Sequence, residues 1–314
     1  MVIEAQVPLK LTLFGEHAVV YGKPAIAYTI SEYLRVRVLP SEKFYVRSSS
    51  LQITGVNVDL HEFKIENENV KKVLAYVVEA INYFDVKRPA LIEIESTVEP
   101  SVGLGTSAAV AVGVVAAYSR YIGLDLKKEE IANIAHKVEL KVQGLASIMD
   151  TTTETLGGFV YIKGDDAERL TVNDNVMFSA GYFRRIATTA EMLRKVKSFK
   201  EKNSDLFNHF LHLIERITET ARSYLKSGDI EGLGELMYAN HGVLFSLGIT
   251  VPVIDQLVST ARSAGVKGCK ISGGGGGGSV ICTKDERAEL LIHAMGGRVV
   301  NATPTFEGVR IKLI

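Results

Sequence analysis

The pattern of apolar and polar residues divides the chain into a strand-rich first half and a helix-rich second half. Most of the first forty residues have the pattern of strands, and Leu34–Val38 alternates apolar and charged side chains, as a half-buried strand does. Apolar residues recur at helical spacing from Val70 to Phe84, which predicts a helix after Asn69. Alternation and β-branching predict a further strand at Ala90–Val98.

Two helices and a strand are predicted in the rest of the first half. A turn leads into an apolar helix from about Thr106 to Ile122, and we expect Asp125 to cap the helix after it. The strand Gly157–Lys163 then closes this half. The buried stripe of the second helix is predicted to comprise Ile131, Ile134, Ala135, Val138 and Val142.

The second half has the pattern of a small sheet combined with long helices. A strand is predicted over Asn175–Phe183, and three amphipathic stretches extend from about Ser204 to Ala264, with breaks near residues 228–229 and 248–252. Two or three strands and a helix at Lys284–Met295 complete the chain. We therefore predict an α+β protein of two domains, residues 1–165 and 166–314.

Charge and composition exclude several classes of protein. Lys and Arg together number 36, as do Asp and Glu, so the formal net charge is zero, which argues against a general nucleic-acid binder. The apolar stretch Ala108–Tyr118 is far shorter than the roughly 18–20 residues that span a bilayer. Residues Met1–Phe14 lack the pattern of a signal peptide. We expect a soluble, cytoplasmic protein that binds neither nucleic acid nor membrane.

The two cysteines also lead us to expect a cytoplasmic protein. Cys269 and Cys282 form neither a C-x-x-C motif nor a zinc-binding spacing, so we expect no disulfide framework and a reducing environment.

A glycine-rich turn, Pro100–Ala109 (PSVGLGTSAA), precedes the apolar helix. Gly103 and Gly105 allow backbone angles and close approaches that a Cβ would block. The unpaired N–H groups at a helix start can bind a phosphate chain without any lysine. The hydroxyls of Thr106 and Ser107 add a candidate ligand for magnesium. A simple capped helix after a turn is the alternative interpretation.

The same turn also satisfies the dinucleotide-binding fingerprint through Gly103, Gly105 and Ala108. That fold needs a second parallel strand ending in an acidic residue about 20 positions further on. Asp125 has nearly that spacing, but it begins a helix in our prediction, which argues against a nicotinamide or flavin enzyme. No G-x-x-x-x-G-K-[ST] motif occurs, so a Walker-type nucleotidase is unsupported.

The N-terminal segment concentrates further candidate chemistry. Lys10 lies inside an apolar strand, where a charge is costly without an anionic partner. Glu16 and His17 follow in a tight turn and together offer hydrogen-bond donors and acceptors to a polar substrate. For His17 alone, a place in a surface hairpin is the alternative.

Three segments carry a resemblance to a known family. Gly15–Ala27 (GEHAVVYGKPAIA) resembles the N-terminal motif of the mevalonate kinase family. Pro100–Ala109 resembles the phosphate-binding motif of the wider superfamily of galactokinase, homoserine kinase, mevalonate kinase and phosphomevalonate kinase. Lys270–Ser279 (KISGGGGGGS) resembles the third motif of that superfamily. The motifs occur in the family's order, and the resemblance covers essentially the whole chain.

The resemblance implies a fold and an activity. The fold is a strand-rich N-terminal domain (ribosomal protein S5 domain 2-like) and a ferredoxin-like α+β C-terminal domain, with the active site in the cleft between them. The activity is ATP-dependent phosphorylation of mevalonate to 5-phosphomevalonate in isoprenoid precursor biosynthesis. ATP and mevalonate are then the expected ligands, Mg²⁺ the expected cofactor, and a homodimer one assembly that the family allows.

The resemblance also assigns roles to residues. Asp150 is the catalytic base, and Lys10 stabilises developing charge and keeps Asp150 ionised. Ser107 and Glu139 hold Mg²⁺, Glu139 being eleven residues before Asp150 as in the family. The residues implied to contact mevalonate are Glu16, His17 and Thr189. Those implied to bind ATP and its phosphates are Pro100, Ser101, Val102, Gly103, Leu104, Gly105, Thr106, Ser107, Ala108, Ala109, Gly274 and Gly275.

Two features of the sequence need separate comment. Between Glu139 and Asp150 the chain reads QGLASIM from Gln143 onward, where many mevalonate kinases read HGNPSGV, so Gln143 replaces a histidine. The six glycines Gly273–Gly278 could form a flexible linker. Their place between two strand-like segments favours a loop whose backbone approaches a ligand.

Other functions remain open at this stage. A kinase of the same superfamily acting on phosphomevalonate would need additional cations, for which Lys23, Arg184 and Arg185 are candidates. A non-catalytic nucleotide-binding protein on the same fold is the alternative from another class.

Overall fold

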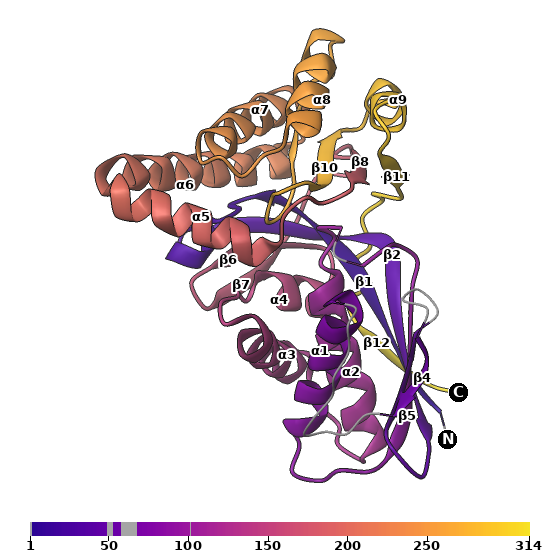
Figure 1. The fold of residues 1–314 in the computed structure, drawn as a ribbon. Helices are drawn as coiled ribbons and strands as arrows, with labels where there is room; N and C mark the ends of the chain where they lie inside the picture. Colours follow the sequence, from indigo (N-terminus) through magenta and orange to yellow (C-terminus); the bar gives the residue numbers. More distant parts are fainter. Residues whose placement is uncertain (1, 49–52, 58–67, 101) are drawn as a thin grey trace.

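The computed structural model describes residues 2–48, 53–57, 68–100 and 102–314, arranged around two β-sheets. In Figure 1 most strands of the larger sheet lie on the right of the lower half, with helices from the first half of the chain on their left. The smaller sheet lies in the upper half together with helices α5 to α9. The fold is therefore mixed α+β, as predicted.

The larger sheet has eight strands within the described residues. They are β1 (Ile3–Phe14), β2 (Ala25–Pro40), β3 (Tyr45–Ser48), β4 (Ile53–Asn57), β5 (Ala90–Ser96), β6 (Phe159–Lys163), β7 (Asp166–Leu170) and β12 (Arg310–Leu313). Their order is β12-β1-β2-β5-β3-β4, and β6 pairs with the first residues of β2 and with β7. All these pairs are antiparallel except β3 with β5.

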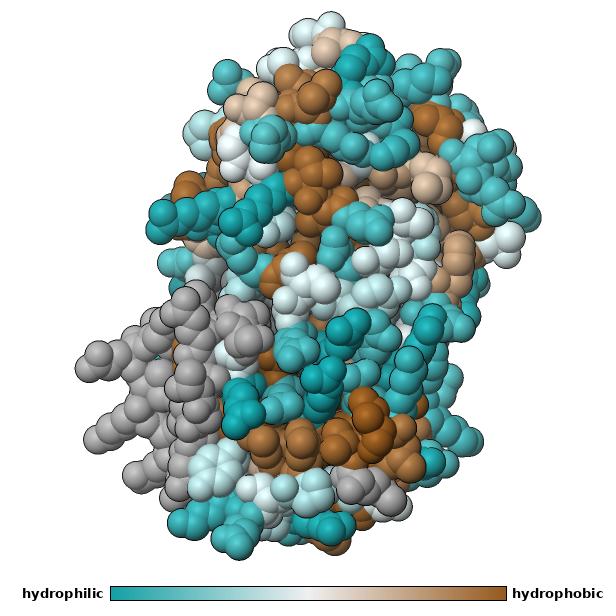
Figure 2. Space-filling view, turned by 90° about the vertical axis from the view of Figure 1, so that its right-hand side faces the viewer, coloured by the Kyte–Doolittle hydropathy of each residue, from teal (hydrophilic) through white to brown (hydrophobic). Residues whose placement is uncertain are grey.

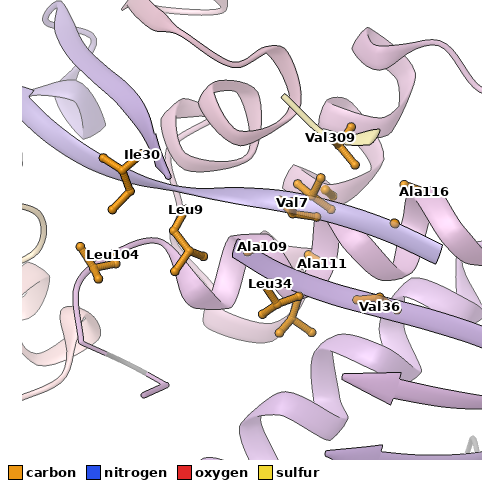
Figure 3. Packing of buried hydrophobic residues seen from close by; sticks show 14 of the residues in the cluster. Val7, Leu9, Ile30, Leu34, Val36, Leu104, Ala109, Ala111, Ala116 and Val309 are labelled. Carbon is orange, nitrogen blue, oxygen red and sulfur yellow. The ribbon is translucent and has the colours of Figure 1, made fainter. Parts of the chain in front are cut away.

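Helix α2 lies against the larger sheet and forms the centre of the core. The first-half helices are the 3-10 helix η1 (Ala18–Tyr21), α1 (Glu68–Asn82), α2 (Thr106–Tyr121), α3 (Lys128–Gln143) and α4 (Met149–Leu156). A helix that is apolar on all sides is expected to be buried, and nearly every residue of α2 is. Figure 3 shows alanines of α2 facing Val7 and Leu9 of β1 and Leu34 and Val36 of β2.

The smaller sheet joins four strands in the described part of the chain, in the order β11-β8-β10-β9. These strands are β8 (Phe178–Phe183), β9 (Cys269–Ile271), β10 (Gly278–Thr283) and β11 (Arg298–Val300). The second-half helices are α5 (Thr189–Lys202), α6 (Ser204–Ser227), α7 (Ile230–Ser246), α8 (Pro252–Ser263) and α9 (Glu286–Ala294). The glycine run lies between β9 and β10, so the expectation of a loop between two strands is confirmed.

Several sequence expectations need correction. Asp125 does not cap α3: Lys127 is its N-cap residue, and Glu130 accepts from the Lys127 N–H, while Asp125 pairs with Arg120. Cys269 and Cys282 face each other on β9 and β10 and form a disulfide, which contradicts the expectation that the chain has no disulfide framework.

The structure also bears on the expected boundary near residue 165. Residues 164 and 165 form the turn of the β6–β7 hairpin, and Gly164 has a φ of 62° there. Strands β7 and β12 both belong to the larger sheet, so the second half of the sequence contributes to it. The division of the chain into 1–165 and 166–314 stays a prediction.

The surface mixes polar and apolar side chains. The view in Figure 2 is mostly hydrophilic, with one continuous brown area in its lower half, the half that contains the larger sheet. In the described part of the chain, no helix has the length and apolar character needed to cross a membrane.

Candidate active site

A cleft between the two halves brings most of the candidate residues together. Its cavity volume is about 130 Å³, and it opens to solvent. One wall comes from β1, α1, α2, α3 and α4, and the other from the segment before α5 and the glycine loop. Of the candidate residues, the cleft is lined by Lys10, Glu16, His17, Gly103, Gly105, Thr106, Ser107, Ala108, Glu139, Asp150, Thr189 and Gly274.

A lysine–aspartate ion pair lies in the cleft wall. The Nζ of Lys10 is 2.7 Å from Oδ1 of Asp150 and also donates to the Thr12 hydroxyl at 3.0 Å. The Lys10 side chain is only 2% exposed, whereas that of Asp150 is 31% exposed. The strand lysine thus has the anionic partner that its burial requires. Asp150, in the first turn of α4, remains accessible to a substrate.

The glycine-rich turn ends at the N-terminus of α2, where Gly105 is the N-cap residue with a φ of 80°. A Cβ at Gly105 would lie 2.1 Å from a carboxylate oxygen of Glu154, so only glycine fits there. The side chains of Val102 and Leu104 are buried in the core. Those two residues can therefore offer a phosphate only their backbones.

The other turn residues differ in their positions. Ala109 is also buried in the core, and Pro100 does not line the cleft. Ser101 lies outside the described residues. The role of these residues in binding phosphate stays a prediction.

Two candidate metal ligands come from different helices. Ser107 is in the first turn of α2, and Glu139 is in the last turns of α3, where it is 4% exposed. Burial, together with the negative charge of Asp150, raises the pKa of Glu139 to about 8. A buried carboxylate and a hydroxyl on the same cleft are hard oxygen donors of the kind that Mg²⁺ takes.

His17 has a strained backbone and an unpartnered ring nitrogen. Its φ is 61°, and it is the one non-glycine residue with positive φ in the described part of the chain. Its Nε2 lies 3.0 Å from the Gly274 carbonyl, which can only accept, so the proton belongs on Nε2. Burial lowers the pKa of His17 to about 4, and the ring is neutral. Buried Nδ1 has no partner and is an acceptor without a donor.

Glu16 has a different environment from the one we expected. Oε1 forms an ion pair with Lys270, and Oε2 accepts from Asn240 at 3.1 Å. Burial raises the pKa of Glu16 and lowers that of Lys270, while their mutual attraction opposes both shifts. Both carboxylate oxygens thus have partners within the protein, although Glu16 also lines the cleft, and its contact with the substrate stays a prediction.

The glycine loop and the start of α5 form the opposite wall. The Arg185 guanidinium donates to the Thr189 hydroxyl at 3.2 Å and to the Gly275 carbonyl at 2.7 Å. A Cβ at Gly274 would lie 2.7 Å from the Thr189 side chain, so the loop backbone packs directly on Thr189. Gly275 packs on Ile249 and does not line the cleft.

Sequence reasoning missed part of the site. Lys72 and Tyr76 lie one turn apart on α1, and Lys72 lines the cleft near Glu139 and Arg185. Gln143, singled out as a departure from the family pattern, also lines it. Lys72 and Tyr76 flank an apolar stripe that is ordinary in sequence, so no local signal distinguished them.

Comparisons with known proteins show the family to which the chain belongs. Residues 68–158 match the GHMP kinases N terminal domain, and residues 221–301 match the GHMP kinases C terminal domain. The mevalonate kinase of Saccharolobus solfataricus is 55% identical over 314 residues, covering 100% of both chains. That of Pyrococcus horikoshii is 36% identical over 326 residues, covering 98% of this chain and 97% of the relative.

A solved structure extends the comparison to the fold. The mevalonate kinase of Methanococcus jannaschii superposes with a TM-score of 0.76 at 29% identity, covering 99% of this chain and 96% of that one. The chain thus shares its fold over essentially its full length with a mevalonate kinase, and its sequence with others. It belongs to the GHMP kinases and, within them, to the mevalonate kinase family.

Proposed function

We propose that this chain transfers the γ-phosphoryl group of ATP to the primary hydroxyl of mevalonate, giving 5-phosphomevalonate and ADP. The observation that carries the proposal is the buried Lys10 paired with the accessible Asp150, in the same cleft as a glycine-capped helix N-terminus. Phosphoryl transfer depends mainly on positioning and on neutralising charge, and this arrangement can provide both.

The phosphate chain of ATP would bind at the start of α2. The N–H groups of a helix's first turn have no partner within the helix and carry the positive end of its dipole. The absence of a side chain at Gly103 and Gly105 lets phosphate oxygens approach these donors. This site needs no basic patch, which is consistent with a net charge of zero.

Magnesium fits the donors on the opposite side of that helix start. Ser107 and Glu139 would hold it with a hydroxyl and a carboxylate oxygen, the hard ligands that this ion prefers. Bound there, the ion would neutralise charge on the β- and γ-phosphates.

Asp150 would accept the proton of the substrate hydroxyl as its oxygen attacks the γ-phosphorus. A bond forms between the hydroxyl oxygen and phosphorus, and the bond from phosphorus to the β–γ bridging oxygen breaks, releasing ADP. Lys10 would hold Asp150 in place at 2.7 Å and stabilise the negative charge that develops on the transferred group.

Mevalonate would be recognised by further polar and charged side chains that line the same cleft. Its carboxylate matches the cations Arg185 and Lys72, and its hydroxyls match the hydroxyl of Thr189 and the neutral ring of His17, which also line the cleft. Because a second phosphate on the substrate would also be attracted by Arg185 and Lys72, phosphomevalonate is the competing substrate that a test must include.

The decisive experiment measures ATP-dependent ADP release with mevalonate, phosphomevalonate, homoserine and galactose as separate substrates. We expect turnover with mevalonate only, and a ³¹P spectrum of the product that shows one monophosphate ester on the primary carbon. Turnover with phosphomevalonate but not with mevalonate would reassign the substrate, and turnover with none would contradict kinase activity.

The role of Asp150 is tested separately with Asp150→Asn. We expect ATP binding, measured by calorimetry, to stay within about twofold, while kcat falls by about 10²- to 10⁴-fold, the usual contribution of a general base. The matched control is Asp165→Asn in the exposed β6–β7 turn, which should keep wild-type turnover. If Asp150→Asn retains near-normal kcat, Asp150 is not the base.

A further inference from the structure

A chain of four polar side chains connects helices α1, α2 and α3 at the proposed magnesium ligands. The hydroxyl of Tyr76 on α1 hydrogen-bonds with Ser107 on α2 and with Gln143 on α3. Gln143 donates through Nε2 to the Tyr76 hydroxyl at 2.5 Å and to Oε1 of Glu139 at 3.2 Å. Each ligand that we assign to magnesium is therefore held by a residue from outside the ligand set.

The hydrogen-bond capacities of these groups fit one another. The Gln143 amide has two N–H donors, and both are used, one toward Tyr76 and one toward Glu139. The Tyr76 hydroxyl oxygen accepts one of them and also accepts from the Ser107 hydroxyl, whose lone pairs remain free for a metal ion. Tyr76 is only 1% exposed, and a buried hydroxyl without hydrogen-bond partners would be costly in free energy. The burial of Tyr76 therefore also requires these hydrogen bonds.

We propose that Tyr76 and Gln143 are positioning residues that fix Ser107 and Glu139 for Mg²⁺, an inference that rests on the proposed function. A serine hydroxyl rotates freely, and a glutamate has three side-chain torsions, yet Mg²⁺ demands nearly ideal octahedral ligands. Hydrogen bonds from a second layer of residues remove that freedom. Gln143 engages Oε1 of Glu139, which assigns the other carboxylate oxygen to the metal.

The proposal also explains the glutamine at position 143. A neutral histidine has one N–H donor and one acceptor nitrogen, so it could donate to Glu139 or to Tyr76 but not to both. An amide holds both at once. The departure of this chain from the family pattern is therefore tied to the tyrosine at position 76, and the two residues are expected to act as a unit.

The test measures metal binding rather than turnover. Mn²⁺ replaces Mg²⁺, and free Mn²⁺ is titrated by electron paramagnetic resonance in the presence of a non-hydrolysable ATP analogue. The variants are Tyr76→Phe, Gln143→Leu and the double variant. The control is Tyr118→Phe, which removes a tyrosine hydroxyl bonded to the Arg88 backbone about three turns along α2 from Ser107.

We expect each single variant to weaken Mn²⁺ binding by about 10- to 100-fold, the usual effect of losing an outer-layer partner. The double variant should lose no more Mn²⁺ affinity than the weaker-binding single variant, because every variant breaks the same series of hydrogen bonds. Affinity for the analogue without metal should be unchanged, and Tyr118→Phe should bind Mn²⁺ as the wild type does.

Three outcomes would overturn the proposal: wild-type Mn²⁺ affinity in both single variants, a double-variant loss equal to the product of the single losses, or an equal loss in Tyr118→Phe. None of these measurements uses mevalonate. A failure of the proposed substrate assignment would therefore appear in the ADP-release panel and leave the metal result standing.

Discussion

Single residues in the cleft could be predicted from the sequence only when their partners were implied by a motif or by simple physics. Lys10 in an apolar strand required an anion, and the structure supplies Asp150. The substrate contact expected of Glu16 stays a prediction, whereas its pairing with Lys270 could not be foreseen, because that partner is 254 positions away and nothing local to Glu16 indicates it. His17 combines positive φ, burial and an unpartnered nitrogen, none of which a sequence pattern shows.

The lowered pKa of His17 predicts how the stability of the protein changes with pH. Burial lowers that pKa from 6.5 to about 4, so the unfolded chain binds an extra proton between these values and stability falls as pH decreases through this window. From pH 7 to pH 4.5 the loss due to His17 should be about 2–3 kcal/mol.

The variant His17→Asn tests this prediction, since asparagine tolerates positive φ better than most residues. Urea unfolding of both proteins at pH 7 and pH 4.5 should show that the wild type loses about 2–3 kcal/mol more than the variant. Equal losses in the two proteins would mean that His17 keeps an ordinary pKa.

Helices and strands with a strong apolar periodicity were predicted well. Elements that depend on packing against the rest of the protein were not. Helices α1, α2, α3, α6, α7 and α8 carry clear apolar stripes or runs and appear where expected. Helix α4 was missed because its sequence, MDTTTETL, is rich in threonine, a poor helix former, and packing must stabilise it. Helix α5 was also missed, although Thr188 and Glu191 form a capping box that could have indicated its start.

A glycine-to-alanine change inside a helix usually stabilises a protein, but the close packing of α2 on the larger sheet predicts the opposite effect at Gly113. A Cβ at Gly113 would lie 2.6 Å from Val36 Cγ2, so Gly113→Ala should destabilise the protein by about 1–3 kcal/mol through overpacking. At Gly242 in α7, where no atom would lie within 4 Å of a Cβ, the same change should stabilise by up to about 1 kcal/mol.

Chemical denaturation of the two glycine variants gives the comparison directly. Combining Gly113→Ala with Val36→Ala should recover part of the loss, because it removes the methyl group that the new Cβ meets. If Gly113→Ala is as stabilising as Gly242→Ala, α2 is not pressed against β2 at this point.

At the scale of the whole molecule, the sequence indicated two halves but not how they are joined. Buried polar contacts from β1 and the following turn reach the segment around β9. Thr12 and Ser272 exchange two hydrogen bonds of 2.9 Å, and Glu16 pairs with the fully buried Lys270. The motif at the N-terminus is thus fixed to the third motif by contacts more than 250 positions apart, which no local pattern can reveal.

The pair between Glu16 and Lys270 predicts a large effect on stability from a small change. Glu16→Gln leaves a buried lysine without its counter-charge and should reduce the free energy of unfolding by about 3–5 kcal/mol. The double variant Glu16→Leu/Lys270→Met, which removes both charges, should be more stable than Glu16→Gln.

The matched control is Glu215→Gln, which breaks the partly exposed pair with Lys23 and should change stability by about 0–1 kcal/mol. Urea denaturation measures all three variants, and a KM for mevalonate separates the two roles considered for Glu16. A raised KM with unchanged stability would support Glu16 as a substrate ligand.

The pairing of β12 with β1 has a consequence for the order in which the protein is assembled on the ribosome. Ile3 lies opposite Leu313, so β1 receives this neighbour only after about 300 further residues have been synthesised. Until then β1 is the edge of the larger sheet, with a row of unpaired backbone groups that invites pairing with other chains. The nascent first half therefore exposes the start of this strand to other chains for as long as translation of the second half takes.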